Sequence, residues 1–135
     1  MIKVKRIQHV GVAVQDTSDA ASFYRVLGLE VEHTEELPEV GLKVAMLPVG
    51  ESSIELLEPT RPDATVARFL DKRGEGIHHL AICVEDVEGA VQELLAAGVR
   101  MIDQAPRSGA NGTKVAFVHP AASHGVLIEL VEEPR

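Results

Sequence analysis

Two stretches of the chain, residues 7–14 and 77–84, share one pattern of hydrophobic and polar positions. Large branched side chains occupy every second position. The positions between them hold a histidine, His9 or His79, followed by small residues. Alternation with a period of two is typical of a β-strand, because successive side chains point to opposite faces. We therefore predict two strands, each with a branched face suited to a helix and an opposite face that leaves space beside the imidazole.

A helix is predicted after each of these strands. Asp16 and Asp86 are suitable N-cap residues, and the apolar positions that follow them recur at helical spacing. Gly28 and Gly98 stand where a helix commonly ends in a left-handed residue. Three short strands are then predicted in each half, over residues 30–36, 43–48 and 52–58 and over residues 99–104, 114–119 and 125–132.

The two halves are copies of one unit. Aligning residue n with residue n+70 needs no gap from Ile7 to Val31 and gives six identities in 25 positions, far more than composition alone explains. Predicted modules β-α-β-β-β therefore cover residues 6–59 and 76–134. A linker over residues 60–75, with a helix over 64–72, joins them, and residues 1–135 are expected to form one α+β domain. The identities are Ile7/Ile77, His9/His79, Val14/Val84, Asp16/Asp86, Ala20/Ala90 and Gly28/Gly98.

The composition excludes several classes of partner and cellular location. The chain has 135 residues, 45% of them hydrophobic, and a net charge of −8. This charge argues against nucleic acid and against a polybasic membrane anchor as partners. No apolar run approaches the roughly 20 residues of a membrane-spanning helix, and the N-terminus lacks a signal-peptide pattern. Cys83 is the only cysteine, so an internal disulfide is impossible and a reducing, cytoplasmic location is expected.

Two histidines and two glutamates occupy equivalent places in the two modules. A single histidine within a strand is more often a satisfied core residue, but His9 and His79 correspond to each other. Glu55 and Glu129 each lie between Ile and Leu in the last strand of a module. Either these carboxylates point to water, or they are buried and need a partner. The correspondence of both pairs favours one shared metal site, with donors suited to Zn, Co, Mn, Ni or Fe(II).

Other chemistry is weakly supported. Cys83 lies on the histidine face without an obvious base, which favours a buried thiol over a nucleophile. His33 and His124 are expected to be exposed, and the role of His119 before Pro120 is open. The sequence has no Ser-His-Asp pattern, P-loop or dinucleotide fingerprint.

The paired modules, with His-Val-Gly-Val-Ala-Val and His-His-Leu-Ala-Ile-Cys-Val, resemble the vicinal oxygen chelate (glyoxalase-like) superfamily. Within it, the likeness is strongest to the methylmalonyl-CoA epimerases and covers nearly the whole chain. The loop Pro38-Glu39-Val40-Gly41 and the linker residues 65–70 are the stretches that narrow it to these enzymes. The resemblance implies a cupped eight-stranded mixed sheet around a metal site, an acyl-CoA substrate and a homodimer.

The resemblance also implies roles for individual residues. His9, His79 and Glu129 become metal ligands, and Glu55 ligates directly or through water, because some relatives have glutamine there. The cofactor is then a divalent ion (Co, Zn, Mn, Ni or Mg). Glu39 matches a second catalytic carboxylate, and the equivalent loop of the second module, residues 108–112, has no acid.

These roles describe an enzyme that inverts the carbon α to a thioester by removing its proton on one face and returning one on the other. Glu39 and Glu129 are the predicted bases. Two alternatives remain open at this stage. One is another enzyme of the superfamily, such as a lactoylglutathione lyase or an Fe(II) dioxygenase, and the other is a metal-free binding protein of the same fold. Arg107, Lys114 and Lys43 are available cations for coenzyme A, whose place the sequence leaves open.

Overall fold

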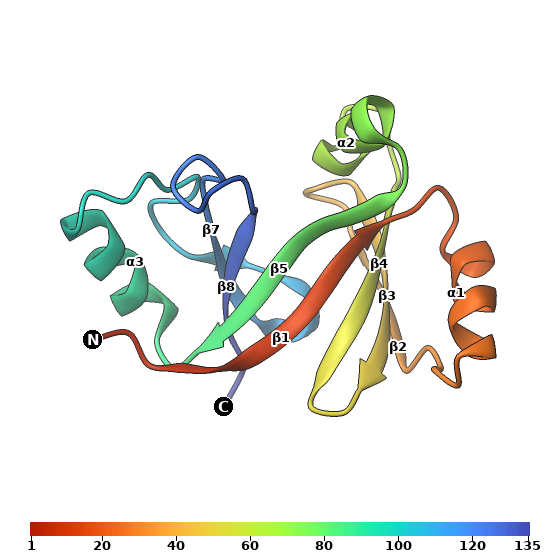
Figure 1. Cartoon of the computed structure of the whole chain (residues 1–135), viewed down its shortest axis with the longest axis horizontal. Coiled ribbons are helices and arrows are strands. Elements are labelled where there is room, and N and C mark those ends of the chain that lie inside the picture. Colours follow the sequence, from red (N-terminus) through yellow and green to blue (C-terminus); the bar gives the residue numbers. More distant parts are fainter. The chain divides into compact units, whose positions relative to one another are not determined.

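The computed structural model describes residues 1–135 as two compact units. Unit 1 combines Met1–Gln8 with His79–Arg135, and unit 2 is His9–His78. Strands β1 (Val4–Ala13) and β5 (Gly76–Val84) each run from one unit into the other along the chain (Figure 1).

Unit 2 contains a four-stranded sheet with the order β2-β3-β4-β1. Strand β1 is parallel to β4, whereas β2 and β4 are both antiparallel to β3, as a βαβ crossover followed by a meander requires. Its further elements are α1 (Thr17–Val26), β2 (His33–Leu37), β3 (Leu42–Val49), β4 (Ser52–Pro59) and α2 (Thr65–Arg73).

The two helices of unit 2 cover opposite faces of this sheet. Leu56 packs in one hydrophobic cluster together with Ala21 of α1. Its neighbour Leu57 packs in a second hydrophobic cluster together with Val66 and Leu70 of α2. Because successive strand residues alternate between faces, α2 lies on the face of Ala13, which is also that of His9. The linker helix therefore covers one end of the histidine face.

Unit 1 repeats the arrangement. Strand β5 is parallel to β8, the strands run in the order β5-β8-β7-β6, and α3 stands beside β7 and β8 (Figure 1). Val87 and Val91 of α3 are fully buried against Ala116 and Leu130. The remaining elements are α3 (Val87–Ala96), β6 (Arg107–Ser108), the short 3₁₀ helix η1 (Ala110–Gly112), β7 (Lys114–Val118) and β8 (Ile128–Glu132).

The predicted helix ends are confirmed. The Asp16 carboxylate accepts hydrogen bonds from the amides of Ser18 and Asp19, at 2.8 and 3.2 Å. Asp86 accepts one from Gly89 at 3.1 Å. A cap of this kind stabilises a helix by about 1 kcal/mol.

Gly28 and Gly98 follow the two helices with φ of +94° and +80°, the left-handed region that glycine enters without steric cost. In both copies, an aspartate caps the first turn of the helix and a left-handed glycine follows its last turn. The copies therefore share their local folding signals as well as their strand pattern.

The strand predicted over residues 99–104 is wrong. Only Met101 makes a bridge there, to Val118, and the chain then leaves the sheet until β6. The Asp103 carboxylate accepts the Phe117 amide at 2.9 Å, so a side chain takes the place of the main-chain acceptor that a continuing strand would supply. Two other predicted strands are shorter than expected, β2 beginning at His33 and β8 at Ile128.

None of the three α-helices has both the length and the apolar composition that crossing a membrane requires.

Candidate active site

The half-site of unit 2 consists of His9 and Glu55, which are only 5% and 6% exposed. Strands β1 and β4 pair so that Gly11 stands beside Glu55. Because glycine has no side chain, the carboxylate can extend along the sheet face toward His9, which lies one strand period before Gly11. His9 Nδ1 and Glu55 Oε2 lie 3.1 Å apart.

The half-site of unit 1 has the same construction. His79 and Glu129 are 6% and 7% exposed, and Ala81 stands beside Glu129 in the register of β5 and β8. His79 Nε2 and Glu129 Oε1 lie 3.0 Å apart. Each copy of the repeat therefore buries one imidazole against one carboxylate, and the register that does so is conserved between the copies.

Both pairs suit a divalent cation. Two atoms that bind one ion at about 2.1 Å, with an angle between 90° and tetrahedral, lie about 3.0–3.4 Å apart. The nitrogen-to-oxygen distances of both half-sites, 3.1 and 3.0 Å, lie within this range, which direct ion pairs such as His33–Glu35 also occupy, so burial is what distinguishes the half-sites. Burial of a carboxylate is costly without a positive partner, which a cation supplies. Imidazole and carboxylate are also the mixed donor set that Zn, Co, Mn and Ni accept.

Sequence reasoning missed one neighbour in each half-site. Phe117 on β7 pairs with Glu129, and its ring meets the His79 ring edge-on at 5.6 Å between centroids. Met46 on β3 pairs with Glu55 in the same way. The repeat could have identified both neighbours. Lys43-Val44-Ala45 aligns with Lys114-Val115-Ala116, and the residues that follow, Met46 and Phe117, are therefore equivalent.

The structure places Glu39 elsewhere in unit 2. It is exposed in the turn of residues 38–41 between β2 and β3. The adjoining Leu42 pairs with Pro59, four residues along β4 from Glu55, which corresponds to about 13 Å along the strand. The turn is held by Arg61, whose guanidinium donates to the carbonyls of Pro38 and Glu39.

The remaining histidines differ from His9 and His79. His33 and His124 are exposed, as expected. The ring of His78 packs edge-on against Phe69 of α2, at 5.0 Å between centroids. His119 Nδ1 accepts the Ala121 amide at 3.0 Å and so supports the turn that follows β7.

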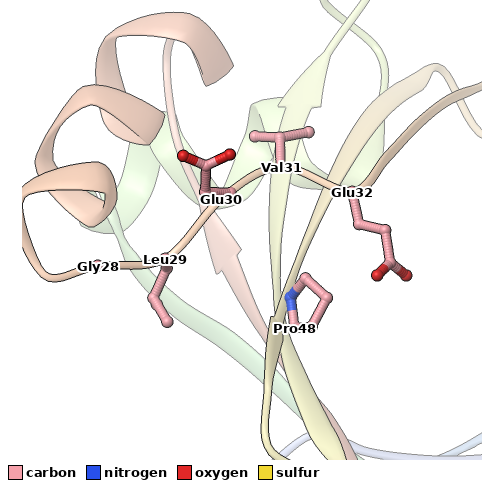
Figure 2. Close-up of a pocket in the computed structure, with 6 residues that line it drawn as sticks. All are labelled: Gly28, Leu29, Glu30, Val31, Glu32 and Pro48. Carbon is pink, nitrogen blue, oxygen red and sulfur yellow. The ribbon is translucent and has the colours of Figure 1, made fainter.

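A shallow hollow of about 380 Å³ adjoins the end of α1. The side chains of Glu30 and Glu32 point in different directions at its rim (Figure 2). They do not converge on a common point, so this hollow offers no binding chemistry comparable to that of the half-sites. Its lining residues are Gly28, Leu29, Glu30, Val31, Glu32 and Pro48.

Cys83 is a fully buried thiol, as expected from its place on the histidine face. Burial raises its pKa, and the charge of the nearby Glu133 raises it further. The thiol is therefore neutral at neutral pH and a poor nucleophile.

Burial alone would raise the pKa of Glu133. Hydrogen bonds from Arg6 and Gln8, together with the Arg6 charge, outweigh burial and lower that pKa below its ordinary value. A carboxylate whose pKa is lower in the folded protein stabilises it above the unfolded-state pKa, and this contribution is lost as the pH falls through the folded-state pKa.

We therefore expect Arg6→Met to decrease the free energy of unfolding by about 1 kcal/mol at neutral pH, and by progressively less as the pH falls through the folded-state pKa of Glu133. Urea unfolding at a series of pH values from neutral into acid measures this dependence. Lys3→Met is the control, because Lys3 and Glu85 form a much more exposed pair at 3.8 Å. A loss in Arg6→Met that stays the same across the whole pH series would contradict the assignment to Glu133.

Comparison with known proteins agrees with this fold and chemistry. The sequence profile of the glyoxalase/bleomycin resistance protein/dioxygenase superfamily matches residues 8–117. The chain therefore belongs to this superfamily, and the predicted fold class is confirmed.

Individual relatives narrow the comparison to epimerases. The ethylmalonyl-CoA/methylmalonyl-CoA epimerase of Cereibacter sphaeroides is 38% identical, and the match covers 94% of this chain and 97% of that protein. A Streptomyces coelicolor methylmalonyl-CoA epimerase, solved with 2-nitronate-propionyl-CoA, is 41% identical with a TM-score of 0.94. That match covers 97% of this chain and 96% of the other. The uncharacterised Bacillus subtilis protein YqjC is 42% identical, covering 96% of this chain and 93% of that one.

Proposed function

We propose that the protein is a metal-dependent epimerase of methylmalonyl-CoA that interconverts the (R) and (S) forms of this thioester. The observation that carries the proposal is the buried histidine–glutamate pair that each copy of the repeat builds at the same register. Identities of about 40% to named methylmalonyl-CoA epimerases support this substrate over others of the superfamily.

In this proposal, His9, His79 and Glu129 hold one divalent ion. All three are buried, and together they have a composition that such an ion accepts. Glu55 is the fourth candidate ligand, directly or through water. When bound, the ion supplies the positive charge that stabilises an enolate oxygen. Its identity among Co, Zn, Mn, Ni and Mg stays open, because the four donors suit several of them.

The reaction needs two proton-transferring groups on opposite faces of the α-carbon. We propose that Glu39 removes the proton from one epimer, and that Glu129 returns a proton on the other face. In the reverse direction Glu129 removes the proton and Glu39 returns one. The exposed turn gives Glu39 access to a substrate that arrives from solvent, whereas Glu129 acts from the buried sheet face.

The deciding experiment is incubation of one epimer of methylmalonyl-CoA with the enzyme in deuterated water, following configuration and label together. We expect inversion with deuterium at the α-carbon, and loss of both after metal is removed by a chelator. Recovery of the starting epimer without label would refute the proposal. Ethylmalonyl-CoA in a parallel assay tests how large an α-substituent the site accepts.

We also propose that the protein is a cytoplasmic homodimer. The dimer rests on the resemblance to the epimerases, and the location rests on the single cysteine. Sedimentation equilibrium of the purified chain gives its molar mass in solution and tests the dimer.

A further inference from the structure

The turn that carries Glu39 is fixed at both ends by its own main chain. The amides of Val40 and Gly41 donate to the carbonyls of Leu37 and Pro38, both at 3.2 Å. The Gly41 carbonyl in turn accepts the Thr60 amide at 2.8 Å, which ties the turn to the residue after β4. Gly41 has a φ of +67°, a conformation that other residues rarely adopt.

Arg61 adds a second, side-chain attachment. Its terminal nitrogens donate to the Pro38 carbonyl at 2.6 Å and to the Glu39 carbonyl at 3.1 Å. Its Nε donates to Asp63 Oδ1 at 2.7 Å, which orients the guanidinium plane. A Cβ at position 41 would lie only 3.0 Å from Arg61 Cγ and 3.1 Å from Nε, so the arginine lies directly against Gly41.

These two hydrogen bonds control the direction of the Glu39 Cα–Cβ bond. The Pro38 carbonyl belongs to the peptide plane before the Glu39 Cα, and the Glu39 carbonyl belongs to the plane after it. Peptide planes are rigid, so fixing both planes fixes φ and ψ of Glu39 and with them the direction of its Cα–Cβ bond. Without Arg61, the exposed turn keeps its main-chain hydrogen bonds, but two of these are long, at 3.2 Å, and would allow this direction to vary more.

We infer that Arg61 is a positioning residue for Glu39. This inference rests on the proposed function, because it gives Glu39 the role of a base. Arg61 acts through the main chain: it fixes the direction in which the Glu39 side chain leaves the turn, so that less conformational freedom is lost when the α-proton is transferred. The planar, forked guanidinium is suited to this task because it reaches two neighbouring carbonyls at once, which a lysine ammonium cannot do with the same directionality.

The first test compares Arg61→Met and Arg61→Lys with Arg68→Met. Arg68 lies on α2 and donates to the Asp63 carbonyl at 3.0 Å, so Arg68→Met removes a nearby cation and leaves the turn contacts in place. We expect Arg61→Met to slow deuterium exchange about 10–100-fold from the epimer that Glu39 deprotonates, with exchange from the other epimer unchanged. KM should not change, Arg61→Lys should be intermediate, and Arg68→Met should resemble the wild type.

A double variant separates positioning from general damage to the fold. If Arg61 acts only through Glu39, adding Arg61→Met to Glu39→Gln causes no further loss of exchange from either epimer. A loss from both epimers in Arg61→Met, or additive losses in the double variant, would overturn the inference. Near-wild-type thermal unfolding of each variant shows that the fold has survived.

A second measurement does not depend on activity. Amide hydrogen exchange of the peptide spanning residues 36–43 should become at least about 10-fold faster in Arg61→Met and stay unchanged in Arg68→Met. Unchanged protection in Arg61→Met would show that the arginine does not hold the turn. A loosened turn with normal deuterium exchange from both epimers would overturn the positioning role. If the wild-type protein has no epimerase activity, the positioning role fails with the proposed function, and this measurement still reports whether Arg61 holds the turn.

Discussion

Glu39→Gln is expected to abolish inversion of methylmalonyl-CoA while leaving the metal content of the protein unchanged. Glutamine has nearly the size of glutamate but cannot accept the α-proton, and a general base contributes about 10²- to 10⁴-fold to the rate. Deuterium exchange should be lost from one epimer and persist from the other, which Glu129 deprotonates. Stopped assays that start from each epimer in deuterated water measure both exchange rates.

The matched control for this variant is Glu36→Gln. Glu36 is exposed on β2, three residues before Glu39, so both changes remove one surface charge from the same hairpin. We expect Glu36→Gln to behave as the wild type does. Normal exchange from both epimers in Glu39→Gln would remove Glu39 from the mechanism. Loss of metal in this variant would place Glu39 among the ligands instead.

His9→Ala has the second large expected effect, loss of the bound metal ion. Changes in groups that merely support a ligand already lower metal affinity about 10- to 100-fold, so removing a ligand should cost at least as much. Elemental analysis of protein purified without added metal should find the ion in the wild type and a strong decrease in the variant. Inversion should fall in parallel and recover only partly at high metal concentration.

His33→Ala is the control for the loss of a histidine–glutamate pair as such. His33 and Glu35 also have a nitrogen-to-oxygen distance of 3.1 Å, but His33 is exposed on β2. We expect its metal content to equal that of the wild type. Equal metal content in His9→Ala and the wild type would contradict the proposed ligand set. Full activity of a metal-free wild-type protein would refute metal dependence as a whole.

The local chemistry of the fold was predictable because it is encoded by neighbouring residues. Asp16 and Asp86 begin helices, and Gly28 and Gly98 follow their ends, since capping depends on a few adjacent backbone groups. The strand predicted over residues 99–104 failed because the Asp103 side chain competes for the Phe117 amide, 14 residues away. A competitor at that distance in sequence leaves no local signal. That both modules form one domain over residues 1–135 stays a prediction.

Some residues of the candidate site were likewise predictable from the sequence, and others were not. The repeat identified His9, His79, Glu55 and Glu129. Of the two alternatives for the glutamates, pointing to water or being buried with a partner, the structure confirmed burial. The repeat could also have identified Phe117 and Met46, which occupy equivalent positions. Arg61 carried no such signal, because its contacts to the Pro38 and Glu39 carbonyls span 23 and 22 residues and depend on how the linker folds back.

The sequence by itself determined the duplicated β-α-β-β-β order, the helix ends and the residue types of the two half-sites, because periodicity, capping and duplication are properties of the linear chain. Only the tertiary structure decided the register that sets Gly11 beside Glu55 and Ala81 beside Glu129, and with it the burial of both carboxylates. It also decided that Arg61 holds the turn of Glu39. Register and turn attachment depend on groups far apart in the chain, and folding is what brings those groups into contact.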